Sequence, residues 1–336
     1  MRTAPIIVGL VSSVAAFAIA ARISSEMPRH VDVGDGTFLR MHVEGRRGPV
    51  LVLEMETDER MRARLAQFAR VVDYNRAGWG DSVASGPKRD ADQIAQELHT
   101  ALGNFHLDPP YILVGDTVGS LFVRRFAQMF PKEVGGVVLL DPVVEEEAPG
   151  ATLGWLKANR PDTYKQFQQI IQENGAQAGF SLEWIRYVHA VERMKFEQLL
   201  GKAAPEQRKA WLGIVDRRLQ TEESSREIYA FIKGSVGSEL NEFLAFEDTF
   251  RQLRTGGPLP AVPIQIITSR GRSDGVNPDE ASFDRAEHEY MRQRQAGLIA
   301  NVATGEHLTT AMALSDPDYL VGVLEKLVAK TSARRP

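Results

Sequence analysis

The sequence contains no cysteine, and this absence removes several kinds of chemistry at once. Without a thiol, the chain forms no disulfide, has no thiolate nucleophile and has no cysteine ligand for a metal. Its seven histidines also lack the spacing of a metal-ligand motif. No motif implies a cofactor.

The chain also has little net charge and little compositional bias. Forty basic and 44 acidic residues leave a formal charge of −4, spread evenly along the chain. This balance argues against nucleic acid or another strongly charged partner. There is no internal repeat and no low-complexity tract, and the composition is that of a soluble globular enzyme. With 336 residues, the chain can form one domain with a large insertion, or two domains.

One long apolar segment lies at the N-terminus. Ala4 to Ala21 carries no charge, with Arg2 before it and Arg22 after it. Its length falls between the apolar core of a signal peptide and a membrane-spanning helix. Ala18-Ile19-Ala20 would suit signal peptidase. We favour an uncleaved membrane anchor over a cleaved signal within residues 1–23, and either one predicts a membrane-anchored or secreted, periplasmic protein.

The rest of the chain is organised around residues 111–120. An apolar run from Tyr111 meets Gly115, turns at Thr117 and continues through Gly119 into an apolar stripe with helical spacing. This pattern predicts a strand, a sharp turn and a helix. The two glycines suit a turn where strand and helix backbones approach closely, which is the mechanical basis of the G-x-S-x-G nucleophile elbow. Here threonine takes the central position.

Two neighbouring stretches support this interpretation. Residues 70–82 predict a strand followed by a glycine-rich loop, and residues 135–142 predict a buried strand that ends at Asp141. The ordered set resembles the α/β-hydrolase superfamily, with residues 75–82 similar to its D-R-x-G-x-G-x-S loop. The resemblance runs from Val31 to Val328 and is weaker in the middle third. It implies an α/β fold: a mostly parallel sheet with helices on both faces and an inserted helical cap.

The remaining pattern follows this order. We expect a hairpin over 31–43, strands over 49–53, 262–268 and 298–303, a helix over 91–104 and a final helix that Asp316 caps. Residues 145–259 are polar with helical periodicities. The predicted division is therefore a core over 24–143 and 260–336, with a helical cap over 144–259.

The resemblance also implies a catalytic triad in the chain order nucleophile, acid, histidine. Thr117 takes the nucleophile position, and His307, which we place just after the last predicted strand, takes the position of the base. The acid is Asp274, after the seventh strand, or Asp141, after the sixth; Asp279 is a weaker candidate. The oxyanion hole is expected from backbone N–H groups of Val118 and of Met55 or Glu56.

Several residues depart from the superfamily pattern. Thr117 is β-branched at a position that normally has positive φ, and Glu54, Glu56 and Asp116 add carboxylates near the site. Two functions therefore remain open. The first is hydrolysis of an ester or amide in a small molecule through a covalent Thr117 intermediate. The second is a catalytically inactive pseudohydrolase that binds a ligand or protein partner at the membrane.

Overall fold

The computed structural model describes residues 28–86, 89–145, 161–162, 164–165, 169, 200–201, 203–217, 241–242, 245–269, 278–310 and 317–332. The N-terminal apolar segment, Asp274 and Asp316 lie outside these residues. Within the described part, no helix is both long enough and apolar enough to cross a bilayer.

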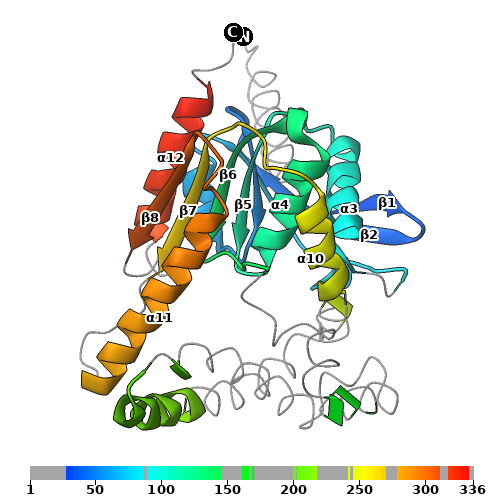
Figure 1. Cartoon of the computed structure of the whole chain (residues 1–336). Coiled ribbons are helices and arrows are strands. Elements are labelled where there is room, and N and C mark those ends of the chain that lie inside the picture. Colours follow the sequence, from blue (N-terminus) through cyan, green and yellow to red (C-terminus); the bar gives the residue numbers. More distant parts are fainter. Residues whose placement is uncertain are drawn as a thin grey trace, which may run out of the picture.

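An eight-stranded sheet forms the centre of the molecule (Figure 1). The strands lie in the order β1-β2-β4-β3-β5-β6-β7-β8. β1 and β2 are antiparallel to their neighbours, and all pairs from β4 to β8 are parallel. The bounds are β1 (Arg29–Gly34), β2 (Thr37–Glu44), β3 (Val50–Glu54), β4 (Arg70–Tyr74), β5 (Tyr111–Asp116), β6 (Val134–Leu140), β7 (Ile264–Ser269) and β8 (Gly305–Thr310).

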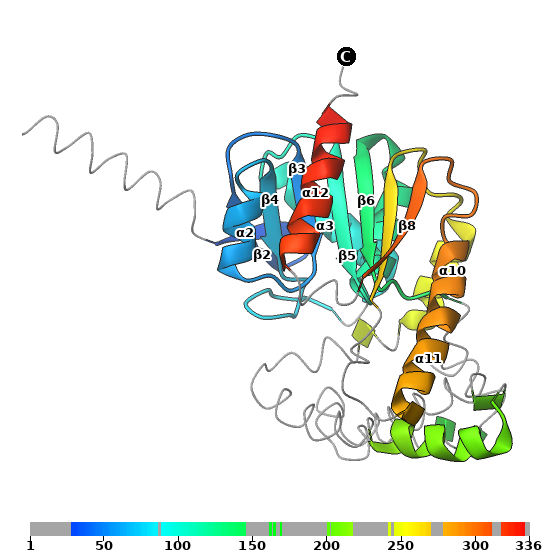
Figure 2. The ribbon, with the colours of Figure 1, turned by 90° about the vertical axis from the view of Figure 1, so that its left-hand side faces the viewer.

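Helices cover both faces of this sheet (Figures 1 and 2). Their bounds are α2 (Glu59–Leu65), α3 (Ala91–Asn104), α4 (Gly119–Met129), α10 (Phe246–Thr255), α11 (Pro278–Gly297) and α12 (Pro317–Ser332), with a 3-10 turn η1 (Pro131–Glu133). α2 and α12 contact each other on one face, whereas α3, α4 and α10 pack together on the other. The α/β fold class predicted from the sequence is therefore confirmed.

Successive side chains of the central strands alternate between the two faces of the sheet. Leu51, Leu53, Ile112 and Val114 pack towards α2 and α12, together with Val138 and Leu140. Their sequence neighbours belong to the core on the α3 and α4 face: Val50, Val52, Leu113, Val137 and Leu139. Because successive side chains of a strand point to opposite faces, the same parity places Glu54 on the α4 face and Asp116 on the α2 and α12 face.

Most of the predicted elements agree with the structure. The hairpin, the strands at β3, β5, β6 and β7, helix α3 over residues 91–104 and the final helix are all confirmed. Helices α2 and α11 were not predicted.

The predicted last strand over 298–303 is wrong. These residues form successive turns, in which the N–H groups of Leu298, Ile299 and Val302 bond carbonyls three residues earlier, and β8 begins at Gly305. Their apolar side chains pack on the core from these turns. A short apolar run by itself does not distinguish a strand from a buried turn.

The cap is only partly described. Residues 205–217 are helical, and Trp211 packs edge-on against Phe283 of α11 with ring centroids 5.5 Å apart. α10 packs against α3 and α4, where Thr249 Oγ1 accepts a hydrogen bond from Ala91 N. The cap over 144–259 and the division of the core around it remain predictions.

Candidate active site at the carboxyl end of the sheet

Thr117 occupies a strained turn between β5 and α4. Its φ is +46°, in the left-handed region that a β-branched residue rarely adopts. Glycine is required on both sides of this turn. A Cβ on Gly115 would lie 2.5 Å from Val123 Cγ2, and a Cβ on Gly119 would lie 2.8 Å from Glu54 Cγ and closer still to the Glu54 carbonyl oxygen. The chain therefore has the backbone of a nucleophile elbow.

The Thr117 hydroxyl is exposed at the end of the sheet. Thr117 Oγ1 donates a hydrogen bond to Asp116 Oδ1 over 3.1 Å. The Thr117 N–H bonds the Leu140 carbonyl over 2.9 Å, which fixes the turn beside β6. Val118 follows as the N-cap of α4, and the next N–H groups, of Ser120 and Leu121, bond the carbonyls of Thr117 and Val118. Backbone N–H groups at such a position suit an oxyanion, and the oxyanion role of Val118 stays a prediction.

The pKa of the Asp116 carboxyl group lies close to neutral pH. Burial raises the pKa of Asp116 to about 6, the hydrogen bond from Thr117 lowers it, and the nearby charges of Asp141 and Glu56 raise it. The net result is a group that is mostly ionised at pH 7 to 8 and accepts a proton readily.

A cavity of about 370 Å³ lies against Asp116 on the α2 and α12 face. Its lining residues are Met55, Glu56, Thr57, Asp58, Met61, Asp116, Pro317 and Leu320. Met55 and Glu56, the predicted oxyanion residues after β3, thus lie at the cavity that Asp116 also lines. Whether either backbone N–H binds an oxyanion stays a prediction.

Asp141 lies next to the elbow, at the end of β6. Its φ is +40°, and its Oδ1 accepts a hydrogen bond from Ser269 N over 2.7 Å. Because Asp116 pairs in register with Leu140 of β6, Asp141 lies one residue beyond that pair, beside Thr117. The structure therefore brings Thr117, Asp116 and Asp141 together. The other acid candidate, Asp274, lies outside the described residues, and Asp279 is in the first turn of α11.

His307 lies inside β8, and not after the last strand as expected. Its partner across the strands is Ile266, so its side chain is on the α3 and α4 face of the sheet. His307 Nε2 is 2.7 Å from Thr268 Oγ1. Thr268 also donates to Gln295 Oε1, and Gln295 Nε2 donates to the Pro142 carbonyl over 3.0 Å.

This chain of hydrogen bonds fixes the tautomer of His307. The Pro142 carbonyl only accepts, so the amide nitrogen of Gln295 faces it and the amide oxygen faces Thr268. Thr268 must then give its single proton to Gln295, and His307 Nε2 must donate to Thr268. The pKa of His307 is lowered, first by burial and then by the charges of Arg292 and His288. His307 is therefore a neutral imidazole with its Nε2 proton committed to Thr268.

The structure does not bring His307 to Thr117. β5 and β8 are separated by β6 and β7. Three strand spacings amount to roughly 14 Å. His288 of α11 is nearer the ends of the strands, with Nδ1 3.2 Å from the Ser269 carbonyl. Sequence reasoning missed His288 because it lies in a polar helix with no recognisable motif. The base role of His307 stays a prediction.

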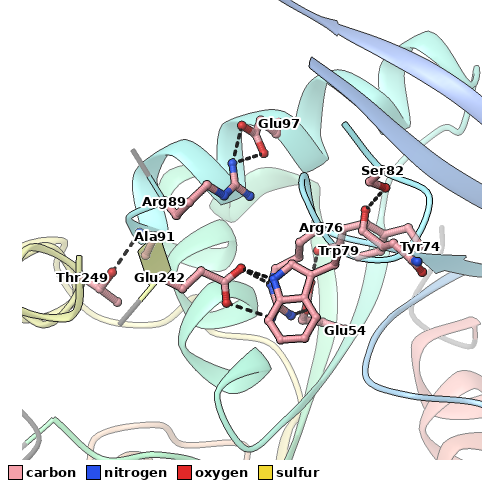
Figure 3. A network of polar contacts seen from close by, with 11 residues as sticks. Glu54, Tyr74, Arg76, Trp79, Ser82, Arg89, Ala91, Glu97, Glu242 and Thr249 are labelled. Carbon is pink, nitrogen blue, oxygen red and sulfur yellow. Dashed lines mark hydrogen bonds and ion pairs between the residues drawn. The ribbon is translucent and has the colours of Figure 1, made fainter. Parts of the chain in front are cut away.

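Behind the elbow, Glu54 belongs to a buried ionic network on the α4 face (Figure 3). Arg76, in the glycine-rich loop after β4, donates to Glu54 Oε1 and forms a two-bond pair with Glu242 at 2.7 and 2.9 Å. Tyr74 donates to the other oxygen of Glu54, and Trp79 Nε1 donates to Glu242 over 2.8 Å. Glu54 is therefore paired in the interior and does not add a free carboxylate to the catalytic rim.

The charged groups of this network affect one another's pKa values. Burial works to lower the pKa of Arg76, but the carboxylates of Glu242 and Glu54 outweigh it and the pKa is raised. Burial raises the pKa of Glu54, and Arg76 and Tyr74 oppose that rise. The Arg76 guanidinium also lies 4.8 Å from the Trp79 ring centroid and 5.0 Å from that of Phe122 in α4.

Fold and elbow together define the class: this chain has the α/β-hydrolase fold. It is similar to bromoperoxidase from Bacillus anthracis, with a TM-score of 0.52 and 16% identity over 90% of this chain and 100% of that one. A proposed epoxide hydrolase from Pseudomonas aeruginosa gives a TM-score of 0.51 and 16% identity, covering 91% of this chain and 96% of that one.

Similarity in sequence is more limited. YqjL of Bacillus subtilis is 30% identical over 127 residues, which are 36% of this chain and 50% of YqjL. YbdG of the same organism is 28% identical over 108 residues, 32% of each chain. The match thus spans no more than half the length of these curated relatives. No model of a protein family matches the chain. Among the described residues, no cluster of three histidines or carboxylates could hold a metal ion.

Proposed function

We propose that this protein is a hydrolase of esters or amides in small molecules, with Thr117 as the nucleophile. The observation that carries the proposal is the positive φ of Thr117. A β-branched residue in this conformation costs on the order of 1–3 kcal/mol, and such strain is typical of functional sites.

The surroundings of Thr117 support the same function. The hydroxyl is exposed, it lies at the N-terminus of α4, and the cavity beside Asp116 has room for a small acyl or leaving group. Ligands of open α/β sheets bind at the carboxyl ends of the strands. A triad of Thr117 with His307 and Asp274 or Asp141 is the sequence-based form of this proposal, and residues 1–23 would place the enzyme at or beyond a membrane.

Substitutions at Thr117 test the nucleophile. We expect Thr117→Ala to reduce hydrolysis of p-nitrophenyl butyrate to the uncatalysed background. Thr117→Ser should match or exceed the wild type, because it keeps the hydroxyl and removes the methyl group that makes positive φ more costly. The measurement is kcat/KM for the three proteins, with thermal unfolding to show that each is folded.

Other results of this series point elsewhere. Three equally inactive but folded proteins would favour the pseudohydrolase alternative. Activity in the alanine variant equal to wild type would remove Thr117 from the mechanism. An active serine variant of an inactive wild type would identify a hydrolase whose remaining machinery is intact.

The cavity also predicts a charge preference among substrates. Glu56, Asp58 and Asp116 line it, so an anionic acyl group would meet repulsion of about 1–2 kcal/mol at an effective dielectric constant near 20. We expect kcat/KM for a p-nitrophenyl hemisuccinate to be roughly tenfold lower than for the neutral butyrate. Glu56→Gln should narrow this ratio, and so should 0.5 M salt. Equal rates for both esters would place the acyl group outside this cavity.

A further inference from the structure

We propose that Asp116 is the general base that accepts the proton of the Thr117 hydroxyl, an inference that rests on the proposed hydrolase function. The hydrogen bond from Thr117 Oγ1 to Asp116 Oδ1 carries it. At 3.1 Å, the carboxylate is within the 2.6–3.2 Å or so that proton transfer to a general base requires. Asp116 is therefore a catalytic residue that contacts the reacting oxygen.

The fold holds this pair rigidly. Asp116 is the last residue of β5 and pairs in register with Leu140 of β6, while Gly115 and Gly119 fix the turn that carries Thr117. The parity of β5 directs the Asp116 side chain towards α2 and α12, where it lines the cavity. The carboxylate thus contacts the nucleophilic hydroxyl and also lines the space proposed for the substrate.

His307 is poorly placed for the same task. Its side chain is on the opposite face of the sheet, three strands away from β5, and its Nε2 proton is committed to Thr268. Its remaining acceptor, Nδ1, is on a ring that lies three strands away from Thr117. Asp141, the other nearby carboxylate, accepts from Ser269 N with one oxygen.

The electrostatics of Asp116 suit a base. Burial raises its pKa to about 6. The charges of Asp141, at the end of β6, and Glu56, in the loop before α2, also raise it, whereas the hydrogen bond from Thr117 lowers it. Asp58 also faces the cavity, as the N-cap of α2. Above pH 6, Asp116 is ionised and able to accept, and a pKa near the working pH favours transfer in both directions.

Asp116 alone can accept and return the protons that move in acylation and in deacylation. As Thr117 Oγ attacks the carbonyl carbon, its proton passes to Asp116 and the carbonyl electron pair moves to the oxygen. Collapse breaks the bond to the leaving group, which takes the proton from Asp116. In deacylation, water attacks the acyl carbon and gives its proton to Asp116. Collapse breaks the Thr117 Oγ–C bond, Oγ regains that proton, and the acid is released.

The test compares full-length wild type with Asp116→Asn, Asp116→Glu and His307→Gln, using p-nitrophenyl butyrate between pH 5 and 9. Wild-type kcat/KM should rise through an apparent pKa of about 6. Asp116→Asn should lower kcat/KM by about 100-fold or more and remove this rising limb of the pH profile. Asp116→Glu should keep the limb at a rate about tenfold lower, because a carboxylate is retained in a shifted position. Asp35→Asn, at an exposed turn of the β1–β2 hairpin, is the matched control.

Thermal unfolding distinguishes loss of a base from loss of the fold. Because folding raises the pKa of Asp116 from 3.8 to about 6, stability is lost as the pH rises through this range and is not regained above it. The neutral asparagine should therefore unfold at the same or a higher temperature at pH 8. If Asp116→Asn fails to fold, a pH profile of Asp116→Glu without the limb overturns the proposal.

Two further results would overturn it while leaving the hydrolase intact. One is a folded Asp116→Asn protein with near-wild-type kcat/KM, and the other is loss of the limb in His307→Gln alone, which would make His307 the base. Failure of the hydrolase proposal itself looks different, because Thr117→Ala would then be no less active than wild type.

Discussion

Replacing Arg76 by alanine is expected to lower the free energy of unfolding by about 3–5 kcal/mol, the usual cost of removing one partner from a buried ion pair. The loss is large because Arg76 bonds two carboxylates, Glu54 and Glu242, which are 5% and 3% exposed. Both would remain in the interior without their cation. Chemical denaturation at pH 7.5 measures the change, and the midpoint of thermal unfolding should fall by roughly 6–15 °C.

Two comparisons show whether burial is the cause. Arg64→Ala breaks the ion pair with Asp318, which is 78% exposed, and should cost less than about 1 kcal/mol. Combining Arg76→Met with Glu54→Gln and Glu242→Gln removes the orphaned charges and should recover much of the loss. If Arg76→Ala is no more costly than Arg64→Ala, the network contributes little to stability.

The second large effect is expected at Gly119, where α4 begins against the end of β3. Alanine there should destabilise the fold by about 2–3 kcal/mol, because the obstructing atoms include the Glu54 carbonyl oxygen, which belongs to the sheet and cannot move aside. Esterase activity should fall with it, since any shift of α4 moves Thr117. Denaturant unfolding and kcat/KM measure the two effects.

Gly322 provides the matched control for this substitution. It lies within α12, and a Cβ there meets nothing within 4 Å. Gly322→Ala should therefore stabilise the protein by about 0.5–1 kcal/mol, as expected from helix propensity. A Gly119→Ala protein as stable as wild type would show that strand and helix are not in close contact at the elbow.

The sequence predicts this fold best for elements whose burial produces a recognisable pattern of apolar residues. β3, β5 and β6 are apolar on both faces, so each reads as a central strand, and the glycines at 115 and 119 identify the turn. α11 gave no comparable pattern, because Phe283, Asp284 and Gln295 are its only buried residues among those described. β8 is a polar strand at the sheet edge, which let the neighbouring apolar turns be taken for it.

The positions of the candidate site residues could be predicted from the sequence, whereas most of their contacts could not. Thr117, Asp116 and Asp141 follow from the order of the strands, since neighbouring parallel strands end at the same edge. The pairing of Arg76 with Glu242 spans 166 residues, and no local spacing encodes it. The tautomer of His307 depends on Gln295 in another element, so it emerges only once β7, β8 and α11 are placed together.

Two arginines of the core form ion pairs with the two ends of the long segment between β6 and α10. Arg124 of α4 bonds both carboxylate oxygens of Glu145, at 2.6 and 3.1 Å, and Arg76 does the same for Glu242. With both ends anchored, doubling the length of the intervening chain would add only about 0.6 kcal/mol of closure entropy. The stability of the core therefore depends only weakly on the length of the segment that joins these two anchored ends.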